Sequence, residues 1–140
     1  MRVLVDTCIW SHVLRRKHLN NVHVVELKEL IGENRVHLIG PIRQEILSGV
    51  NDEKQFERLR SNLSAFPDLL IKSSDYEKAA EFCNIARKKG IQGSTTDYLI
   101  CAIAHKYSMQ IYTVDRDFER YKKYLPIHLY VMRSDANNLT

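Results

Sequence analysis

Short apolar runs alternate with longer amphipathic segments along most of this 140-residue chain. Such runs are typical of strands, and the segments between them carry apolar residues at the spacing of one helical face. Strands that are separated by helices pair in parallel, through right-handed crossovers. We therefore predict an α/β fold with a central, mostly parallel sheet that is covered by helices. The expected strands are Arg2–Asp6, Arg35–Ile39, Asp68–Lys72, Gln110–Val114 and Ile127–Met132.

The helical segments begin and end at residues that favour helix termini. Pro41 suits a first turn, Gly49 and Gly90 suit helix ends, and the stretch from Ser74 to Glu77 has the form of a capping box. Ser94, Thr95 or Thr96 can cap a later helix. The expected helices are Cys8–Arg16, Val22–Ile31, Gly40 to about Gly49, Asp52–Leu63, Ser74 to Gly90, the segment from that cap to Tyr107, and Asp117–Tyr124; a polar tail, Ser134–Thr140, follows the last strand.

Length and composition are those of one globular domain covering residues 1–140. Lys and Arg number 21 against 17 Asp and Glu, which gives a net charge of +4 and is compatible with a polyanionic partner. The three cysteines are far apart and form no CxxC pair, so we expect reduced thiols in a cytoplasmic protein. The chain opens with a strand-like MRVLVD and contains no long apolar run, so we expect neither a signal peptide nor a membrane span.

Acidic residues occur at four places where a strand meets a helix. Asp6 ends the first apolar run, Glu45 and Asp97 lie in helices that follow turns, and Asp115 and Asp117 follow the Gln110–Val114 run. A parallel sheet gathers the carboxyl ends of its strands along one edge, so these distant acids can converge there. Converging carboxylates repel one another unless a cation lies between them, and hard oxygen ligands suit Mg²⁺ or Mn²⁺.

Such a cluster fits phosphodiester hydrolysis, because a bound metal activates water and offsets the charge that grows on phosphate oxygens. The alternative is purely structural. Asp6 can cap the helix that follows it, and aspartates in first helical turns, such as Asp97 and Asp117, are favoured by the helix dipole alone. The functional interpretation therefore depends on convergence of the acids in space.

Four segments of this chain resemble, in order and spacing, the motifs of the PIN-domain family, and in particular the VapC toxins of VapBC toxin–antitoxin modules. They are VLVDTCIW, PIRQEILSG, the stretch from Ala86-Arg87 through GIQGSTTDYLICAIA, and YTVDRDF. The resemblance implies a three-layer α/β/α sandwich on a parallel sheet. It also implies an endoribonuclease that depends on Mg²⁺ or Mn²⁺, forms a homodimer and is inhibited by a small VapB-like antitoxin.

Family roles carry over residue by residue. Asp6, Glu45, Asp97 and Asp115 match the catalytic acids, all of which would also hold the metal, with Asp117 as an extra or alternative ligand. The resemblance further implies supporting roles. Thr113 would orient the last acid or a water, and Thr7 matches a small hydroxyl residue after the first acid. From its position beside the acids, Arg116 is the best candidate for a phosphate contact, although it can instead balance the local negative charge.

Other features carry weaker predictions. Arg43, near Glu45, has the same two interpretations as Arg116, and the basic runs Arg15–His18 and Arg87–Lys89 suit helix C-termini as well as RNA phosphates. Cys101 and His105 share a helix face but lack further zinc ligands. Ile9 and Trp10 are expected in the core or at a dimer interface, and Val22, Val25 and Leu30 in the core or at a dimer or antitoxin surface.

Two alternatives belong to other functional classes. A non-catalytic PIN module that binds RNA or protein would bind without turnover, and the complete acid set weighs against it. A receiver-like or haloacid-dehalogenase-like phosphate site needs residues that this chain lacks, since Asp68 precedes its strand and position 8 is Cys8. The RNA target, the number of metals and the antitoxin are not determined by the sequence.

Overall fold

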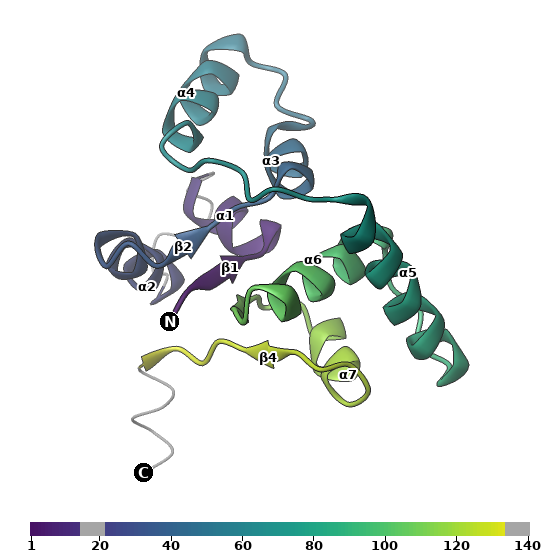
Figure 1. Cartoon of the computed structure of the whole chain (residues 1–140). Coiled ribbons are helices and arrows are strands. Elements are labelled where there is room, and N and C mark those ends of the chain that lie inside the picture. The colour runs from purple at the N-terminus through teal and green to yellow at the C-terminus, as the bar shows by residue number, and fades with distance from the viewer. Residues whose placement is uncertain (15–21, 134–140) are drawn as a thin grey trace.

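A parallel sheet of four short strands forms the centre of the protein in the computed structural model, which describes residues 1–14 and 22–133. The strands are β1 (Val3–Val5), β2 (Val36–His37), β3 (Gln110–Tyr112) and β4 (His128–Leu129). Their order across the sheet is β2-β1-β3-β4, and every neighbouring pair is parallel. Helices cover both faces of this sheet, as predicted for a three-layer α/β/α fold (Figure 1).

The strand order places a topological switch point between β1 and β3. The chain leaves β1 toward β2 on one side and returns to β3 on the other, with Leu4 opposite Ile111 in the register. In open parallel sheets, ligands bind at such a switch point, beyond the carboxyl ends of the strands. Asp6 follows β1 at this edge, and Thr113 follows β3, so the topology brings the first and last acid motifs together.

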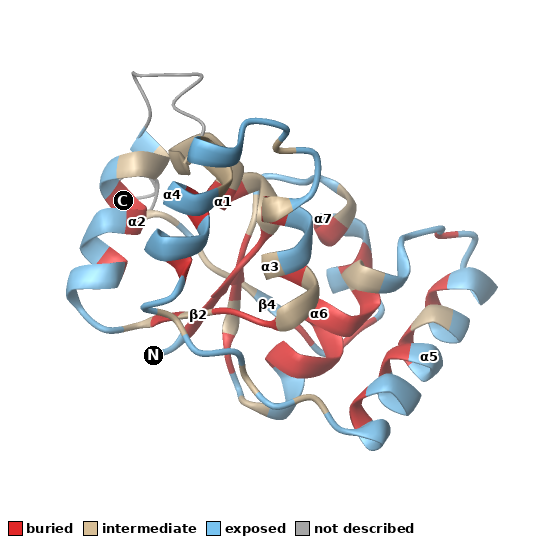
Figure 2. Ribbon diagram, turned by 90° about the horizontal axis from the view of Figure 1, so that it is seen from above, coloured by how far each residue is buried: buried red, intermediate tan, exposed pale blue. Residues whose placement is uncertain are grey.

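Seven helices surround the sheet within the described part of the chain. They are α1 (Thr7–Leu14), α2 (Val22–Gly32), α3 (Gly40–Leu47), α4 (Glu53–Leu63), α5 (Ser73–Lys88), α6 (Thr95–Lys106) and α7 (Asp117–Lys122). Helix α6 is the central one, because every residue from Tyr98 to Ala104 is buried. Helix α5 lies against it and exposes its outer face (Figure 2).

The core combines the sheet with the inner faces of the helices. All three residues of β1 are fully buried, as expected for a strand covered on both faces. On α5, the predicted face is confirmed at Ala79, Phe82 and Ala86, which are buried, and Cys83 is half-buried. Helix α5 ends where predicted. Gly90 follows its last turn with a φ of 76°, a backbone conformation that residues other than glycine rarely adopt.

The segment Asp68–Lys72, predicted as a strand, is not one. It makes a single bridge, Leu38 to Asp68, with the amide of Leu69 donating to the Leu38 carbonyl over 2.9 Å. Leu70 is 66% exposed, whereas Leu69 and Ile71 are partly buried against the core, and α5 begins immediately afterwards at Ser73. The other predicted strands exist but are shorter at one or both ends.

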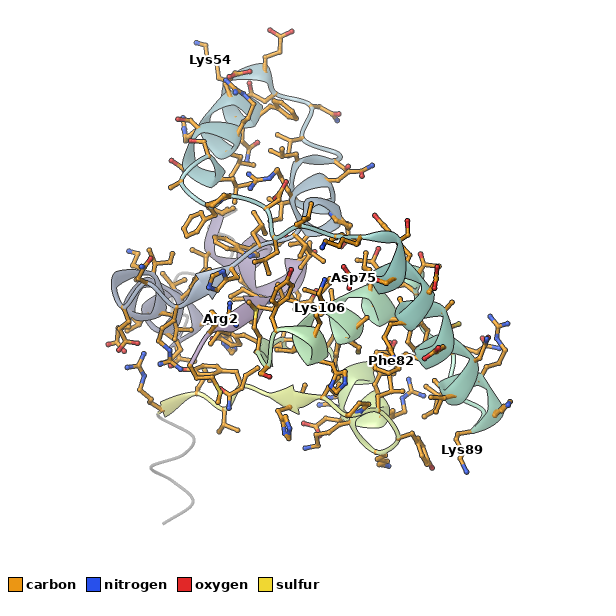
Figure 3. All side chains as sticks on the ribbon, viewed as in Figure 1. Arg2, Lys54, Asp75, Phe82, Lys89 and Lys106 are labelled. Carbon is orange, nitrogen blue, oxygen red and sulfur yellow. The ribbon has the colours of Figure 1, made fainter. Side chains whose placement is uncertain are left out.

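The predicted capping box at the start of α5 is also wrong. Asp75, not Ser74 or Glu77, caps the helix, because its Oδ2 accepts from the amide of Lys72 over 2.8 Å. Asp75 is buried and forms an ion pair with Lys106 of α6 at 3.1 Å (Figure 3). This pair fixes α5 to α6, a contact between distant segments that local sequence cannot reveal.

Several other predictions are resolved by burial. Ile9, Trp10 and Leu30 lie in the core, whereas Val22 and Val25 on α2 are more than half exposed. The basic run Arg15–His18 and the tail Ser134–Thr140 lie outside the described residues. No helix of the described segments is long and apolar enough to cross a membrane.

Candidate active site

Asp6 is the carboxylate at the end of the central strand, and donors occupy both of its oxygens. The amide of Thr7 donates to Oδ1 over 2.8 Å, and the hydroxyl of Thr113 donates to Oδ2 over 2.8 Å. Asp6 is only 7% exposed. Burial raises the pKa of Asp6 above its ordinary value, the hydrogen bonds from Thr113 and Thr7 oppose that effect, and the negative charge of Asp97 adds to it. Asp6 is therefore a buried carboxylate whose pKa is affected by the charge of Asp97.

Glu45 reaches the same edge of the sheet from α3. The hydroxyl of Thr7 donates to Glu45 Oε2 over 2.7 Å, which connects Glu45 to the residue directly after Asp6. Pro41 lies in the first turn of α3 and pre-sets its backbone, one turn before Glu45. The Glu45 side chain is exposed, so its carboxylate is open to a substrate or solvent.

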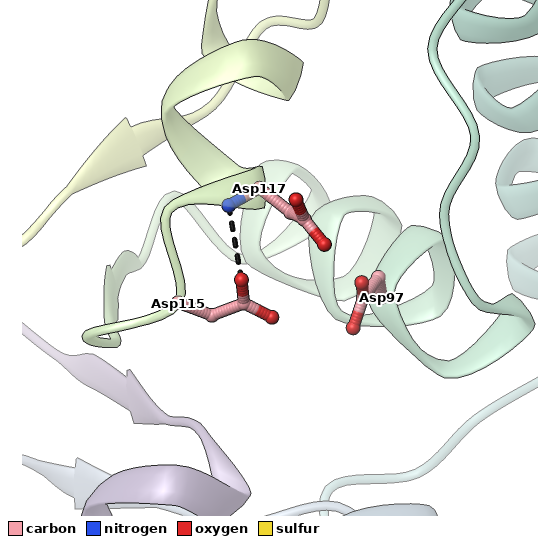
Figure 4. Close-up of side chains that lie close together, drawn as sticks. All are labelled: Asp97, Asp115 and Asp117. Atoms are coloured by element: carbon pink, nitrogen blue, oxygen red, sulfur yellow. Dashed lines mark hydrogen bonds between the residues drawn. The ribbon is translucent and has the colours of Figure 1, made fainter.

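Three further acids converge most closely. Asp97, Asp115 and Asp117 each offer a carboxylate oxygen, and these oxygens lie within 4.8 Å of one another (Figure 4). Within residues 1–14 and 22–133, this is the one group of three or more potential ligands so close together. Asp97 comes from α6, whereas Asp115 comes from the turn after β3 and Asp117 is the first residue of α7. The structure therefore unites three of the five predicted acids, with Asp6 and Glu45 attached through threonines.

Local hydrogen bonds shape the turn after β3. Thr113 Oγ1 accepts from the amide of Asp115 over 3.0 Å, and Asp115 Oδ1 accepts from the amide of Asp117 over 2.9 Å. Because Thr113 also donates to Asp6, its hydroxyl links the two strand ends. Asp117 is in addition paired with Arg120 on the next turn of α7. These bonds hold the turn in the conformation that directs its acids toward α6.

Asp97 is held by two polar side chains from different parts of the fold. Ser94, the cap of α6, accepts from the amide of Asp97 over 3.1 Å, as one of the predicted caps. The hydroxyl of Tyr121 donates to Asp97 Oδ2 over 2.7 Å. Burial raises the pKa of Asp97, the hydrogen bond from Tyr121 opposes this, and the charge of Asp115 raises it further. Burial is the largest cause of the raised pKa values of Asp6 and Asp97, and a neighbouring carboxylate, Asp97 and Asp115 respectively, adds to each.

Two residues at the site were missed as site residues by the sequence argument. Tyr121 has no motif of its own, and its only signal is the four-residue spacing from Asp117 on one helix. Cys8 was expected merely to be a reduced thiol, but its Sγ lies 3.5 Å from Asp6 Oδ2 and 3.5 Å from Thr113 Oγ1. Burial, followed by the charge of Asp6, raises the pKa of the Cys8 thiol, so the neutral thiol fills this space.

The two arginines beside the acids differ in availability. Arg43 is engaged by Asp68 at 2.9 Å and by the carbonyls of Leu63 and Phe66, so it has a structural role rather than an open phosphate-binding face. Arg116 is exposed, and no acid pairs with it within the described segments. Arg116 is therefore the arginine left open beside the acid group.

The alternative zinc pair gains no support from the geometry. Cys101 is buried, whereas His105 is exposed, and neither belongs to a group of ligands within the described residues. The chemistry of the three-acid group does fit a hard divalent cation. All of its potential ligand atoms are carboxylate oxygens. The negative charges of the three carboxylates repel one another when no cation is present. The site has the oxygen ligands that Mg²⁺ or Mn²⁺ prefers.

Comparison with known families places this fold and site in context. The family model of the PIN domain matches residues 3–124. The chain therefore belongs to the PIN domain family. Among curated proteins, it is similar to the ribonuclease VapC11 of Mycobacterium tuberculosis (strain ATCC 25618 / H37Rv). The two are 31% identical over 121 residues, which cover 84% of this chain and 89% of that protein.

Solved structures show the same fold. FitAB bound to an IR36 DNA fragment superposes with a TM-score of 0.75 and 25% identity, over 91% of this chain and 93% of that one. VapBC2 from Rickettsia felis, bound to a DNA fragment from its promoter, gives a TM-score of 0.73 with 19% identity, over 93% and 98% of the two chains. The similarity extends over more than nine-tenths of this chain in both comparisons.

Proposed function

We propose that this protein is a metal-dependent endoribonuclease and the toxin component of a type II toxin–antitoxin pair. The observation that carries the proposal is the convergence of Asp97, Asp115 and Asp117 at the switch point of a PIN domain. The similarity to ribonuclease VapC11 supports the same substrate class. A purely structural role for these acids does not explain why three carboxylates from two segments meet within 4.8 Å.

Asp97, Asp115 and Asp117 would hold Mg²⁺ or Mn²⁺, with Asp6 and Glu45 completing the acidic set. When bound, the metal supplies an activated water and offsets negative charge on the phosphate. The contribution of this chain is to direct carboxylate oxygens at one point while donors hold them. Asp6 is immobilised by Thr113 and Thr7, and a preformed site needs little reorganisation during reaction.

Glu45 and Arg116 would address the RNA itself. Glu45 is exposed beside Asp6 and accepts a hydrogen bond from Thr7, so it is a candidate to orient a water or ribose hydroxyl. Arg116 would contact a phosphate of the bound strand, because it is exposed directly after Asp115. A groove of about 500 Å³, lined by Asp115 and Arg116, runs toward Val131 and would give the RNA strand room beside Asp115.

The protein partner would be a small VapB-like antitoxin, and the toxin would act as a homodimer in the cytoplasm. The structures of FitAB and VapBC2 support the antitoxin part of this proposal, since their folds match over more than nine-tenths of this chain. Val22 and Val25 form an exposed apolar stretch on α2 that would suit a protein contact.

The proposal is tested by RNA cleavage with purified protein in Mg²⁺ or Mn²⁺. We expect cleavage that EDTA abolishes, that returns on adding metal back, and that Asp6→Asn and Asp97→Asn each remove. Glu77→Gln is the matched control, because Glu77 is an exposed acid on α5 whose side chain makes no hydrogen bond or ion pair in the described structure. Cleavage that persists in EDTA or in both aspartate variants would overturn the mechanism, and RNA binding without turnover would favour the non-catalytic module.

A further inference from the structure

Adjacent residues on α7 each bind one acid of the three-acid group. Arg120 pairs with Asp117, which begins the same helix, and Tyr121 donates to Asp97 on α6 over 2.7 Å. Tyr121 is four residues after Asp117, so one short helix carries a metal-ligand candidate at its start and a donor to another candidate one turn later. The hydrogen bond from Tyr121 therefore fixes α7, and Asp117 with it, relative to Asp97.

The Tyr121 side chain has little freedom to do anything else. It is fully buried, and its ring packs against Tyr98 and Phe118 with centroids 5.2 Å and 5.1 Å away. With Oδ2 of Asp97 bound to this immobile hydroxyl, rotation of the Asp97 carboxylate is restricted, and so is the direction of Oδ1. A group that binds the second oxygen of a metal-ligating carboxylate orients that carboxylate without contacting the metal itself.

Gly93 provides the space that this arrangement needs. A Cβ at position 93 would overlap the Tyr121 hydroxyl and would lie 2.8 Å from Cζ and 3.0 Å from Cε1. Real Cβ atoms essentially never approach other atoms below 3.0 Å. The Tyr121 ring would have to move to relieve this overlap, and it is fully buried between Tyr98 and Phe118. Gly93 directly precedes Ser94, the cap of the helix that carries Asp97. Two successive residues thus serve the placement of one carboxylate.

We propose that Tyr121 is a positioning residue for the divalent-cation site, acting through Asp97, and that Gly93 is required because it leaves room for the Tyr121 hydroxyl. The inference rests on the proposed function only in taking Asp97 as a metal ligand. It goes beyond the acid motifs, because neither residue is acidic and neither belongs to a strand-to-helix junction. The proposal assigns a function to the short loop before α6 and to the second turn of α7.

The test is Mn²⁺ affinity measured by calorimetry on the full chain, with unfolding in EDTA as a second measurement. Tyr121→Phe removes the hydroxyl and keeps the ring, and we expect Mn²⁺ binding to weaken about 10- to 100-fold. Tyr98→Phe is the matched control, because Tyr98 is equally buried and its hydroxyl has no hydrogen-bond partner in the described structure. This control is expected to retain wild-type affinity.

The second variant is Gly93→Ala, expected to weaken Mn²⁺ binding in the same way because it displaces the phenol. Its control is Gly32→Ala, since a Cβ at Gly32 meets no atom within 4 Å. Mn²⁺ affinity of Tyr121→Phe equal to that of Tyr98→Phe, with only the unfolding temperature lowered, would overturn the inference and leave the proposed function intact. A wild-type protein that binds no Mn²⁺ would overturn both.

Discussion

Thr113 joins the ends of two neighbouring strands by donating a hydrogen bond to Oδ2 of Asp6 over 2.8 Å. The same oxygen atom of Thr113 accepts from the amide of Asp115 over 3.0 Å, so one hydroxyl connects Asp6 with the turn that carries Asp115. A side chain that the resemblance assigned to the last acid thus acts equally on the first. One hydrogen-bond network therefore connects Asp6, Thr113 and Asp115 at the carboxyl end of the sheet.

Replacing Thr113 with valine keeps the shape and removes the hydroxyl. Because this hydrogen bond lowers the pKa of Asp6, we expect that pKa to rise further and the acid limb of the pH–rate profile to move to higher pH. Cleavage is expected to fall about 10- to 100-fold. Thr96→Val is the control, because the Thr96 hydroxyl makes no hydrogen bond within the described residues. Identical pH–rate profiles for the two variants would contradict the role.

In the metal-free protein, the contribution of Asp6 and Asp97 to stability should be lost as the pH rises. Asp6 and Asp97 have pKa values raised above the ordinary 3.8 in the folded state, so folding favours their protonated forms. Their contribution is fully present below the ordinary pKa and is lost as the pH rises through the raised values. We expect the unfolding temperature in EDTA to fall less for Asp97→Asn than for the wild type between about pH 4 and about pH 7.

Added Mg²⁺ should reverse this loss, because a cation bound only by the folded state stabilises it. The increase in unfolding temperature is expected to be larger at about pH 7 than at about pH 4, since protonated carboxylates do not bind metal. Differential scanning calorimetry with and without EDTA provides the measurement. An increase that does not depend on pH would argue against a carboxylate site.

Arg116→Ala should weaken RNA binding without changing Mn²⁺ affinity. Losing one phosphate contact reduces the slope of the logarithm of the RNA-binding constant against the logarithm of the salt concentration by about 1. The control is Arg58→Ala on α4, because Arg58 is also exposed and forms no ion pair in the described part of the chain. Filter binding with a cleavage-deficient Asp6→Asn background measures the effect. Equal slopes for the two arginine variants would assign Arg116 to local charge balance.

A stability measurement at the start of α5 can compare the cap observed in the structure, Asp75, with the cap predicted from the sequence, Ser74. Asp75→Ala removes the cap on the Lys72 amide and the partner of Lys106, so we expect about 1–2 kcal/mol of destabilisation. Ser74→Ala, at the residue that the sequence favoured as the cap, is expected to change stability by less than about 0.5 kcal/mol. Urea denaturation of both variants makes the comparison. A larger effect at Ser74 would contradict the observed cap.

The missed and corrected residues have a common cause. A capping box at Ser74 and Glu77 satisfies the local pattern, but Asp75 gains an additional partner from α6 that lies 31 residues further along the chain. Asp68–Lys72 has the composition of a strand, yet Arg43 holds Asp68 and Leu70 remains exposed at the margin of the sheet. In both cases, a contact between distant segments outweighs a preference that neighbouring residues set.

The sequence by itself determined the order of the helices, the parallel α/β class, the family and the positions of the five acids, because periodicity, caps and motifs are local. Only the tertiary structure decided which acids share one point in space. The packing of α7 against α6, through Tyr121 and the room left by Gly93, puts Asp117 beside Asp97 and leaves Glu45 linked through Thr7. Distances between carboxylates depend on that packing, and no local pattern records it.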